Sequence, residues 1–346
     1  MNTMIKNPSL VRSQSHKTHT LKLLLKREFW EHKGGFFWAP LISGGIFLLF
    51  QLIGGGALHS VMQRDNKMIH INGDTGFSKS DWARELAQAN AQELSNLRDA
   101  LTGFTMMSAT WPIFVFGFVV FFYLVNAMFE ERKDKSVLFW KSLPVSDAET
   151  VISKVLTALV VAPVIAGLAA IVVMLGSMLM FCGFLALNGV NPFVLYLANL
   201  DYVTIVGSML LWIPVYALWA LPTAGWLLMV SAWAKRVPFL WAVGIPLFVG
   251  VLISWFNLLR IFNVSDSWYW KHIAVRTLTS AFPGSHVFEL ARTGNFTPNK
   301  DFNLREAVLQ TSGTDLLMNP SLWIGAVAGV AMIYVAIRLR RFRDEG

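Results

Sequence analysis

Six consecutive charged residues of mixed sign, at positions 130–135, form the densest charge in the sequence. Val137, Leu138 and Trp140 follow them and would give the same short helix an apolar side. Taken alone, such a charge run is by default a solvated surface, and contact with another protein is the functional alternative. The residues that we assign to the contact are Glu130, Glu131, Arg132, Lys133, Asp134, Trp140, Leu143 and Pro144.

The flanks of this stretch predict how it is held. We expect the helix that precedes it to continue through the charges, because no proline or glycine interrupts it before Pro144. Proline disfavours a helical conformation at the residue before it, so the chain should turn at Leu143. Ser146 and Glu149 have the spacing of a capping box, which predicts a new helix from residue 147.

Four tryptophans recur every seven residues within a long apolar run. Seven residues are nearly two helical turns, so the rings form one stripe that drifts by about 20° per repeat. Such a stripe fits helix packing or lipid contact, and it also fits the wall of a translocation path or a contact with a second copy. The four residues are Trp212, Trp219, Trp226 and Trp233.

Motifs for catalysis are absent from the sequence. It contains no G-x-x-x-x-G-K-[ST] phosphate loop, no LSGGQ signature, no HExxH zinc motif and no G-x-S-x-G elbow. Its single cysteine, Cys182, excludes an intrachain disulfide and a CxxC metal site. We therefore expect no enzymatic activity, cofactor or metal in this chain by itself.

The composition indicates a membrane protein. Hydrophobic residues make up 55% of the chain and charged residues 14%, against about 25% charged residues in soluble domains. About 20 apolar residues form a helix that crosses the hydrocarbon core of about 30 Å. We predict an all-α protein with six spans near residues 36–58, 110–129, 155–184, 204–233, 239–259 and 320–337.

The lysines and arginines predict the orientation. Eighteen of them lie in residues 1–35, in 130–154, at 235–236 and in the basic tail 338–346, whereas eleven lie on the other side. Because positive charge is concentrated in cytoplasmic segments, both termini should be cytoplasmic. The net charge of +8 therefore reflects membrane orientation and does not indicate nucleic-acid binding.

Segments outside the spans also show helical patterns. Residues 20–35 would form an elbow helix in the cytoplasmic interface, unless they are an ordinary basic flank of the first span. We expect a helix near residues 80–101 of the first outer segment, 59–109, and two short helices in the second, 260–319, split by Pro283 and Gly284. The elbow residues are Leu21, Leu24, Leu25 and Phe29 on an apolar face, with Arg27 off it.

The stretch after the second span resembles the cytoplasmic loop of ABC-2 type (type V exporter) permease subunits. Those loops combine an "ER" start, apolar residues, "SLPVS", an acidic residue and a lysine. The outer segment of 50 residues between the first two spans departs from the family pattern, because many relatives have only a short loop there. The matching positions are Glu131, Arg132, Leu138, Ser142, Leu143, Pro144, Val145, Ser146, Glu149 and Lys154.

The resemblance implies one half of a dimeric permease in the bacterial inner membrane. Residues 131–143 would be the coupling helix for a separate ATP-binding subunit, which would carry ATP and Mg²⁺, and a second permease copy would complete the pathway. Spans without charges in their interiors favour an apolar or amphipathic cargo such as a lipid, a peptide or a drug-like molecule. A secondary transporter or channel, and an assembly or sensor subunit that binds a partner through its outer segments, are the alternatives.

Overall fold

In the part of the chain that the structure describes, six helical stretches are long and apolar enough to cross a membrane, which confirms the predicted six-span helical architecture. They are Gly34–Ser60, Gln92–Lys133, Asp147–Leu187, Leu211–Trp233, Pro238–Leu258 and Pro320–Phe342. The structure is a computed structural model that describes residues 17–64, 69–71, 74–77, 90–137, 142, 145–188, 191–195, 202–259, 266–285 and 317–342.

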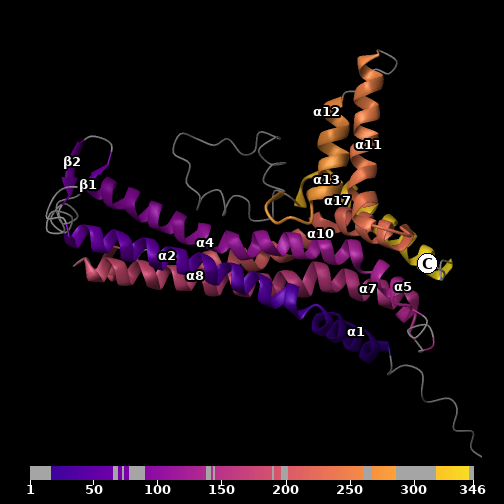
Figure 1. Ribbon diagram of the computed structural model, residues 1–346, viewed down its shortest axis with the longest axis horizontal. Coiled ribbons are helices and arrows are strands. Elements are labelled where there is room, and N and C mark those ends of the chain that lie inside the picture. The colour runs from indigo at the N-terminus through magenta and orange to yellow at the C-terminus, as the bar shows by residue number, and fades with distance from the viewer. Residues whose placement is uncertain are drawn as a thin grey trace, which may run out of the picture.

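The first three spans are long helices that lie side by side (Figure 1). Helix α4 has 36 residues, so at 1.5 Å per residue it extends about 54 Å and exceeds a hydrocarbon core of about 30 Å. Its neighbours are similarly long, because each continues through a π-helical turn without interruption. The elements are η1 (Gly34–Trp38) with α2 (Ala39–Arg64), α4 (Ala91–Asn126), and α7 (Asp147–Leu156), η2 (Thr157–Val161) and α8 (Ala162–Leu187).

Helix α4 corrects one prediction. We expected a separate outer helix near residues 80–101 and a span that begins near 110, but a single helix starts at Ala91. Asn90 caps it, and the Glu93 side chain accepts from the Asn90 backbone N–H at 3.1 Å, which completes a capping box. Pro112 lies inside the helix without ending it. The apolar residues of the outer segment thus extend the second span.

Two later helices pack very closely against each other. In α10 (Tyr202–Trp233), Gly225 faces Gly329 of α17 (Pro320–Phe342), and a side chain on either glycine would collide with the backbone of the other helix. Small residues allow such close approach of helices in membranes. By contrast, α11 (Pro238–Leu258) rises steeply away from the α2, α4 and α8 layer (Figure 1).

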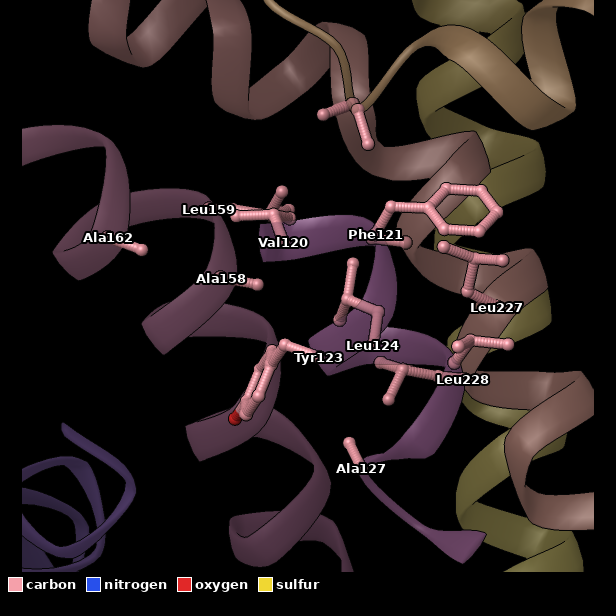
Figure 2. Packing of buried hydrophobic residues seen from close by; sticks show 14 of the residues in the cluster. Val120, Phe121, Tyr123, Leu124, Ala127, Ala158, Leu159, Ala162, Leu227 and Leu228 are labelled. Carbon is pink, nitrogen blue, oxygen red and sulfur yellow. The ribbon is translucent and has the colours of Figure 1, made fainter. Parts of the chain in front are cut away.

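The main hydrophobic core lies where α4 meets η2, α8 and α10 (Figure 2). Leu124 of α4 and Leu227 of α10 are fully buried there, and Ala158 of η2 closes the opposite side. Small alanines beside large leucines let the helices interdigitate at the density of a protein interior. This core ends directly at the residues that lead into the charged stretch.

The segments between spans contain further elements. A two-stranded antiparallel pair, β1 (Ile69–Ile71) and β2 (Asp74–Phe77), lies in the first outer segment, at residues for which we predicted no element. Residues 266–285 pack against the spans: Phe282 lies against Gly117 of α4, and the hydroxyl of Tyr216 donates to the carbonyl of Ala281 at 2.8 Å. This segment comprises α12 (Asp266–Tyr269), η4 (Trp270–Ala274) and α13 (Val275–Thr279); elsewhere, α9 (Pro192–Leu195) follows α8.

Candidate functional site

The charged stretch forms a short separate helix. We predicted that α4 would run through it, but α4 ends at Asn126 and α5 (Phe129–Lys133) begins after a turn. The hydroxyl oxygen of Ser231, on α10, accepts from the backbone N–H groups of Met128 at 3.0 Å and Phe129 at 3.1 Å. A side chain from a distant helix thus satisfies the N–H groups that a helix start leaves unpaired. At the other end of α5, Lys135 has a φ of 56°, and this left-handed conformation ends the helical path of the chain.

Arg132 fixes α5 to the end of α10. Its guanidinium donates to the carbonyl oxygens of Ser231 and Ala234, the latter at 2.8 Å. The last carbonyls of a helix have no partner within the helix and carry partial negative charge, so an arginine stabilises them. Ser231 of α10 thus accepts hydrogen bonds from the start of α5, and Arg132 of α5 donates hydrogen bonds to the end of α10. Together they hold the two helices against each other.

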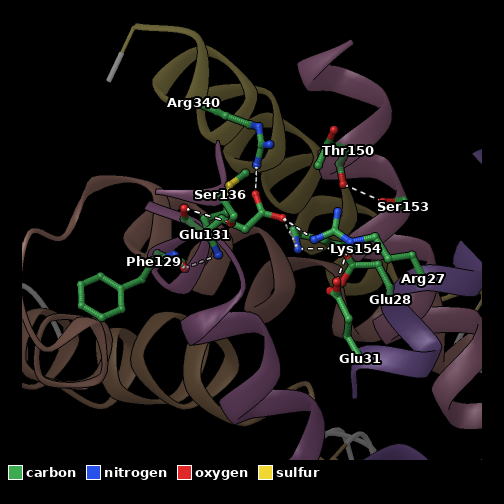
Figure 3. A network of polar contacts seen from close by, with 12 residues as sticks. Arg27, Glu28, Glu31, Phe129, Glu131, Ser136, Thr150, Ser153, Lys154 and Arg340 are labelled. Carbon is green, nitrogen blue, oxygen red and sulfur yellow. Dashed lines mark hydrogen bonds and ion pairs between the residues drawn. The ribbon is translucent and has the colours of Figure 1, made fainter. Parts of the chain in front are cut away.

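Glu131 points inward rather than to the surface (Figure 3). Its carboxylate lies 3.0 Å from the Nζ of Lys154 on α7 and also pairs with Arg340 on α17. Because Glu131 and Lys154 are both buried, each charge depends on the other for stabilisation. The sequence assigned Glu131 to contact with a partner, whereas the structure uses it to join α5 to two spans.

Helix α1 (Lys17–Glu31) joins the same network through Glu28. The Glu28 carboxylate lies 2.8 Å from Lys154 Nζ and accepts from the hydroxyl of Tyr123 on α4 at 2.8 Å. Arg27 pairs with Glu31 at 2.7 Å and lies 3.8 Å from Glu131. Charged side chains of α1, α5 and α7 and the Tyr123 hydroxyl of α4 thus meet at one level of the protein.

The start of α7 completes this cluster, which we call the charge network: Arg27, Glu28, Glu131, Asp147, Lys154 and Arg340. Arg340 donates to Asp147, the first residue of α7, at 3.1 Å. The predicted capping box is present: Glu149 N–H donates to the Ser146 hydroxyl at 3.1 Å, and Ser146 N–H donates to the Glu149 carboxylate at 3.0 Å.

The remaining charges of the stretch are exposed. Three of them are consecutive, at the end of α5 and in the turn after it, and the fourth lies in the first turn of α5, next in sequence to the buried Glu131. A helix held from inside and charged outside presents a defined electrostatic surface. The other predicted contact residues, Trp140, Leu143 and Pro144, lie outside the described part of the chain. The exposed charges are Glu130, Lys133, Asp134 and Lys135.

The predicted elbow helix exists as α1, but its apolar face is used differently from the expectation. Leu24 is buried and packs against the protein rather than lying in lipid, and Leu21, Leu25 and Phe29 are half-buried. Glu28 follows Leu24 by four residues, so it lies on this same inward face.

The tryptophan stripe packs mainly within the chain. Trp219 is buried, its indole N–H donates to the Ser285 hydroxyl at 3.0 Å, and the Arg276 guanidinium lies 4.4 Å from its ring centre. Trp226 donates to the carbonyl of Ala242 on α11 at 2.9 Å. Trp212 stacks on Tyr216 with ring centres 4.9 Å apart, and Trp233 meets Trp241 edge-on at 5.3 Å. These contacts favour the packing interpretation of the stripe.

Three possible metal ligands, Glu28, Glu31 and His32, lie within 4.8 Å of one another. Glu28 is paired with Lys154 and Glu31 with Arg27, so both carboxylates already balance a cation. A metal ion would have to displace these ion pairs, and we assign no metal to the cluster.

Sequence reasoning missed Glu28, Asp147 and Arg340 as site residues. One signal for Glu28 was available: it continues the i, i+3, i+4, i+7 positions of Leu21, Leu24 and Leu25, which makes it a charge on an apolar face. Comparison with family models, curated proteins and solved structures gives no match for this chain.

Proposed function

We propose that this protein is the membrane-spanning subunit of an ATP-binding cassette exporter of the ABC-2 type, driven by a separate ATPase subunit. The sequence motif around residues 131–154 supports the proposal, as do the six spans. In this assignment both termini and α5 face the cytoplasm of a bacterium, and a second permease copy completes the complex. The cargo would be apolar or amphipathic.

The observation that carries the proposal is the attachment of α5. One side of this helix is joined to α10 by Arg132 and to α7 and α17 by Glu131, while the other side exposes Lys133 and Asp134. A force applied to the exposed side therefore reaches three spans through ion pairs and hydrogen bonds, and α4 through the chain itself. An ordinary solvated loop would not need buried charges to hold it.

The mechanism follows from these attachments. In the complex, α5 of each permease copy would sit in a groove of one ATPase subunit. When ATP brings the two ATPase subunits together, each subunit would move the α5 helix that it holds. Glu131 and Arg132 would prevent α5 from swinging independently, so the ends of the spans would move with it. Helix α1, tied to Lys154 through Glu28, would follow the same motion along the membrane surface.

The test is affinity purification from the native host in mild detergent, followed by quantitative mass spectrometry and an ATPase assay. We expect a stoichiometric partner with a phosphate loop and an LSGGQ signature. The charge-swapped double variant Lys133→Glu with Asp134→Lys should lose this partner by about tenfold, which corresponds to about 1.4 kcal/mol. Lys271→Glu, an exposed change on η4, is the matched control and should retain it.

The charge swap leaves the buried network untouched, so a loss of partner would not reflect misfolding. Recovery of the chain without any nucleotide-binding protein would overturn the proposal. Full recovery with the swapped charges would refute the role of the α5 tip.

A further inference from the structure

An open groove of about 800 Å³ lies between α2, α4 and α8, at the end of these helices far from α1. Binding pockets for small molecules are typically about 300–1,000 Å³ and mostly apolar. Phenylalanines and leucines of all three helices line this groove, among them Phe50, Leu101 and Phe184. Gln51 and His59 are its polar lining residues. The groove is therefore large enough for a small-molecule ligand, and its apolar lining suits a hydrocarbon chain.

Three of the four glycines that line the groove face open space. A side chain at Gly54, Gly56 or Gly183 would meet no atom within 4 Å. Outside the groove, two glycines of the same helices are closely packed: a side chain at Gly44 would collide with Val173, and one at Gly176 would come within 2.9 Å of Leu48, whereas Gly45 and Gly167 also face open space. Glycine weakens a helix by about 0.5–1 kcal/mol relative to alanine.

Close helix packing explains Gly44 and Gly176, but it does not explain the glycines of the groove. Gly54, Gly55 and Gly56 are consecutive, and they widen the groove instead of closing it. The absence of side chains at these positions leaves room in the groove, which an unbranched acyl chain can fill.

Polar groups mark one end of the groove. His59 lies in the last part of the first span, and its Nδ1 is 3.3 Å from the amide oxygen of Asn188, which follows α8. Phe47 and Phe104 lie at the other end, among apolar residues. Apart from Gln51, whose side-chain amide donates to the carbonyl of Ser177 at 3.3 Å, the lining is apolar up to His59. An apolar groove with a polar group at the end of the span matches an amphiphile whose head group lies at the membrane surface.

We propose that this groove binds one acyl chain of a phospholipid-like amphiphile, with its head group beside His59 and Asn188. The assignment of this amphiphile as exported cargo rests on the proposed function, whereas the binding itself does not. Its position far from α5 would place the chain in the outer leaflet, where an exporter releases its cargo.

The experiment uses the full chain in nanodiscs of phosphatidylethanolamine and phosphatidylglycerol. A small fraction of the phosphatidylglycerol carries a diazirine on one acyl chain, and mass spectrometry maps the adducts after irradiation. We expect labelling of residues 47–59, 97–104 and 180–187 that saturates as the probe fraction rises. Lipid-exposed Trp323 and Val327 on α17 report non-specific lipid contact and should be labelled in proportion to the probe.

Variants that fill the groove give the second readout. Gly54→Leu with Gly56→Leu should lower groove labelling by about tenfold, the effect of about 1.4 kcal/mol of lost binding. Gly45→Leu, on the same helix, also meets no neighbour but does not line the groove, and it should change nothing. His59→Leu should weaken labelling by the phospholipid but not by a diazirine-bearing alkane, which has no head group.

Labelling of the groove that rises in proportion to the probe, as on α17, would show general lipid contact only and would overturn the site. An equal loss in Gly45→Leu would do the same, and an unchanged His59→Leu would refute the placement of the head group. None of these measurements needs ATP or a partner, so failure of the groove site and failure of the exporter assignment are distinguishable.

Discussion

Replacement of Lys154 by methionine tests whether the charge network stabilises the fold. The ammonium group lies 2.8 Å from Glu28 and 3.0 Å from Glu131, and all three side chains are at most 7% exposed. Methionine keeps the length of the side chain but leaves two buried carboxylates without the cation between them. Removal of one partner from a buried ion pair costs about 3–5 kcal/mol. We expect a loss of this size in the free energy of unfolding.

The assay is a titration of the purified protein with sodium dodecyl sulfate in mixed micelles, followed by tryptophan fluorescence. Lys133→Met is the control, because this lysine is exposed on the neighbouring α5 and should have no measurable effect. In the double variant Lys154→Met with Glu28→Gln, a neutral amide replaces one of the two buried carboxylates that lose their lysine partner. Part of the stability should therefore return, with a coupling energy of about 0.5–3 kcal/mol.

Two results would refute this reasoning. The first is a Lys154→Met protein as stable as the Lys133→Met protein, which would mean that water or lipid head groups replace the lysine. The second is strict additivity in the double variant, because carboxylates and ammonium that share one site must be coupled.

Three further changes can be measured by the same titration. Gly225→Ala should destabilise by about 1–3 kcal/mol, since its methyl group collides with the backbone at Gly329, whereas Gly167→Ala meets no neighbour and should not. Ser231→Ala should cost about 1–3 kcal/mol, because two N–H groups at the start of α5 lose their acceptor. Lys135→Gly should stabilise by about 1 kcal/mol, because glycine adopts the positive φ at that position without strain.

The spans and one helix start could be predicted from the sequence because their causes are local. Hydrophobic length identifies a membrane helix without knowledge of its neighbours, and all six predicted spans correspond to helices. The capping box of Ser146 and Glu149 is formed within four residues, so its spacing was sufficient. Helix α1 could also be predicted, because its helical pattern of apolar and basic residues is likewise local in the sequence.

The break between α4 and α5 could not be predicted, because its cause is distant in the sequence. No residue near 127 breaks a helix; the start of α5 is stabilised by Ser231, more than 100 positions away. The inward position of Glu131 has the same origin, since Lys154 and Arg340 determine it. From the sequence alone, Glu131 and the exposed Lys133 are equivalent members of one charged run.

The positions of the buried charges suggest why this end of the protein needs them. Apolar packing between helices is non-directional, so helices that touch only through leucines and alanines can slide along one another. An ion pair such as Glu131 with Lys154 has a defined geometry, and a slide of a few ångströms would break it at high cost. The charge network therefore fixes the register of α1, α5, α7 and α17 at one end, while the apolar contacts of α2, α4 and α8 continue to an open groove at the other. Under the proposed function, rigid attachment belongs where force enters, and adaptable apolar surface belongs where a cargo leaves.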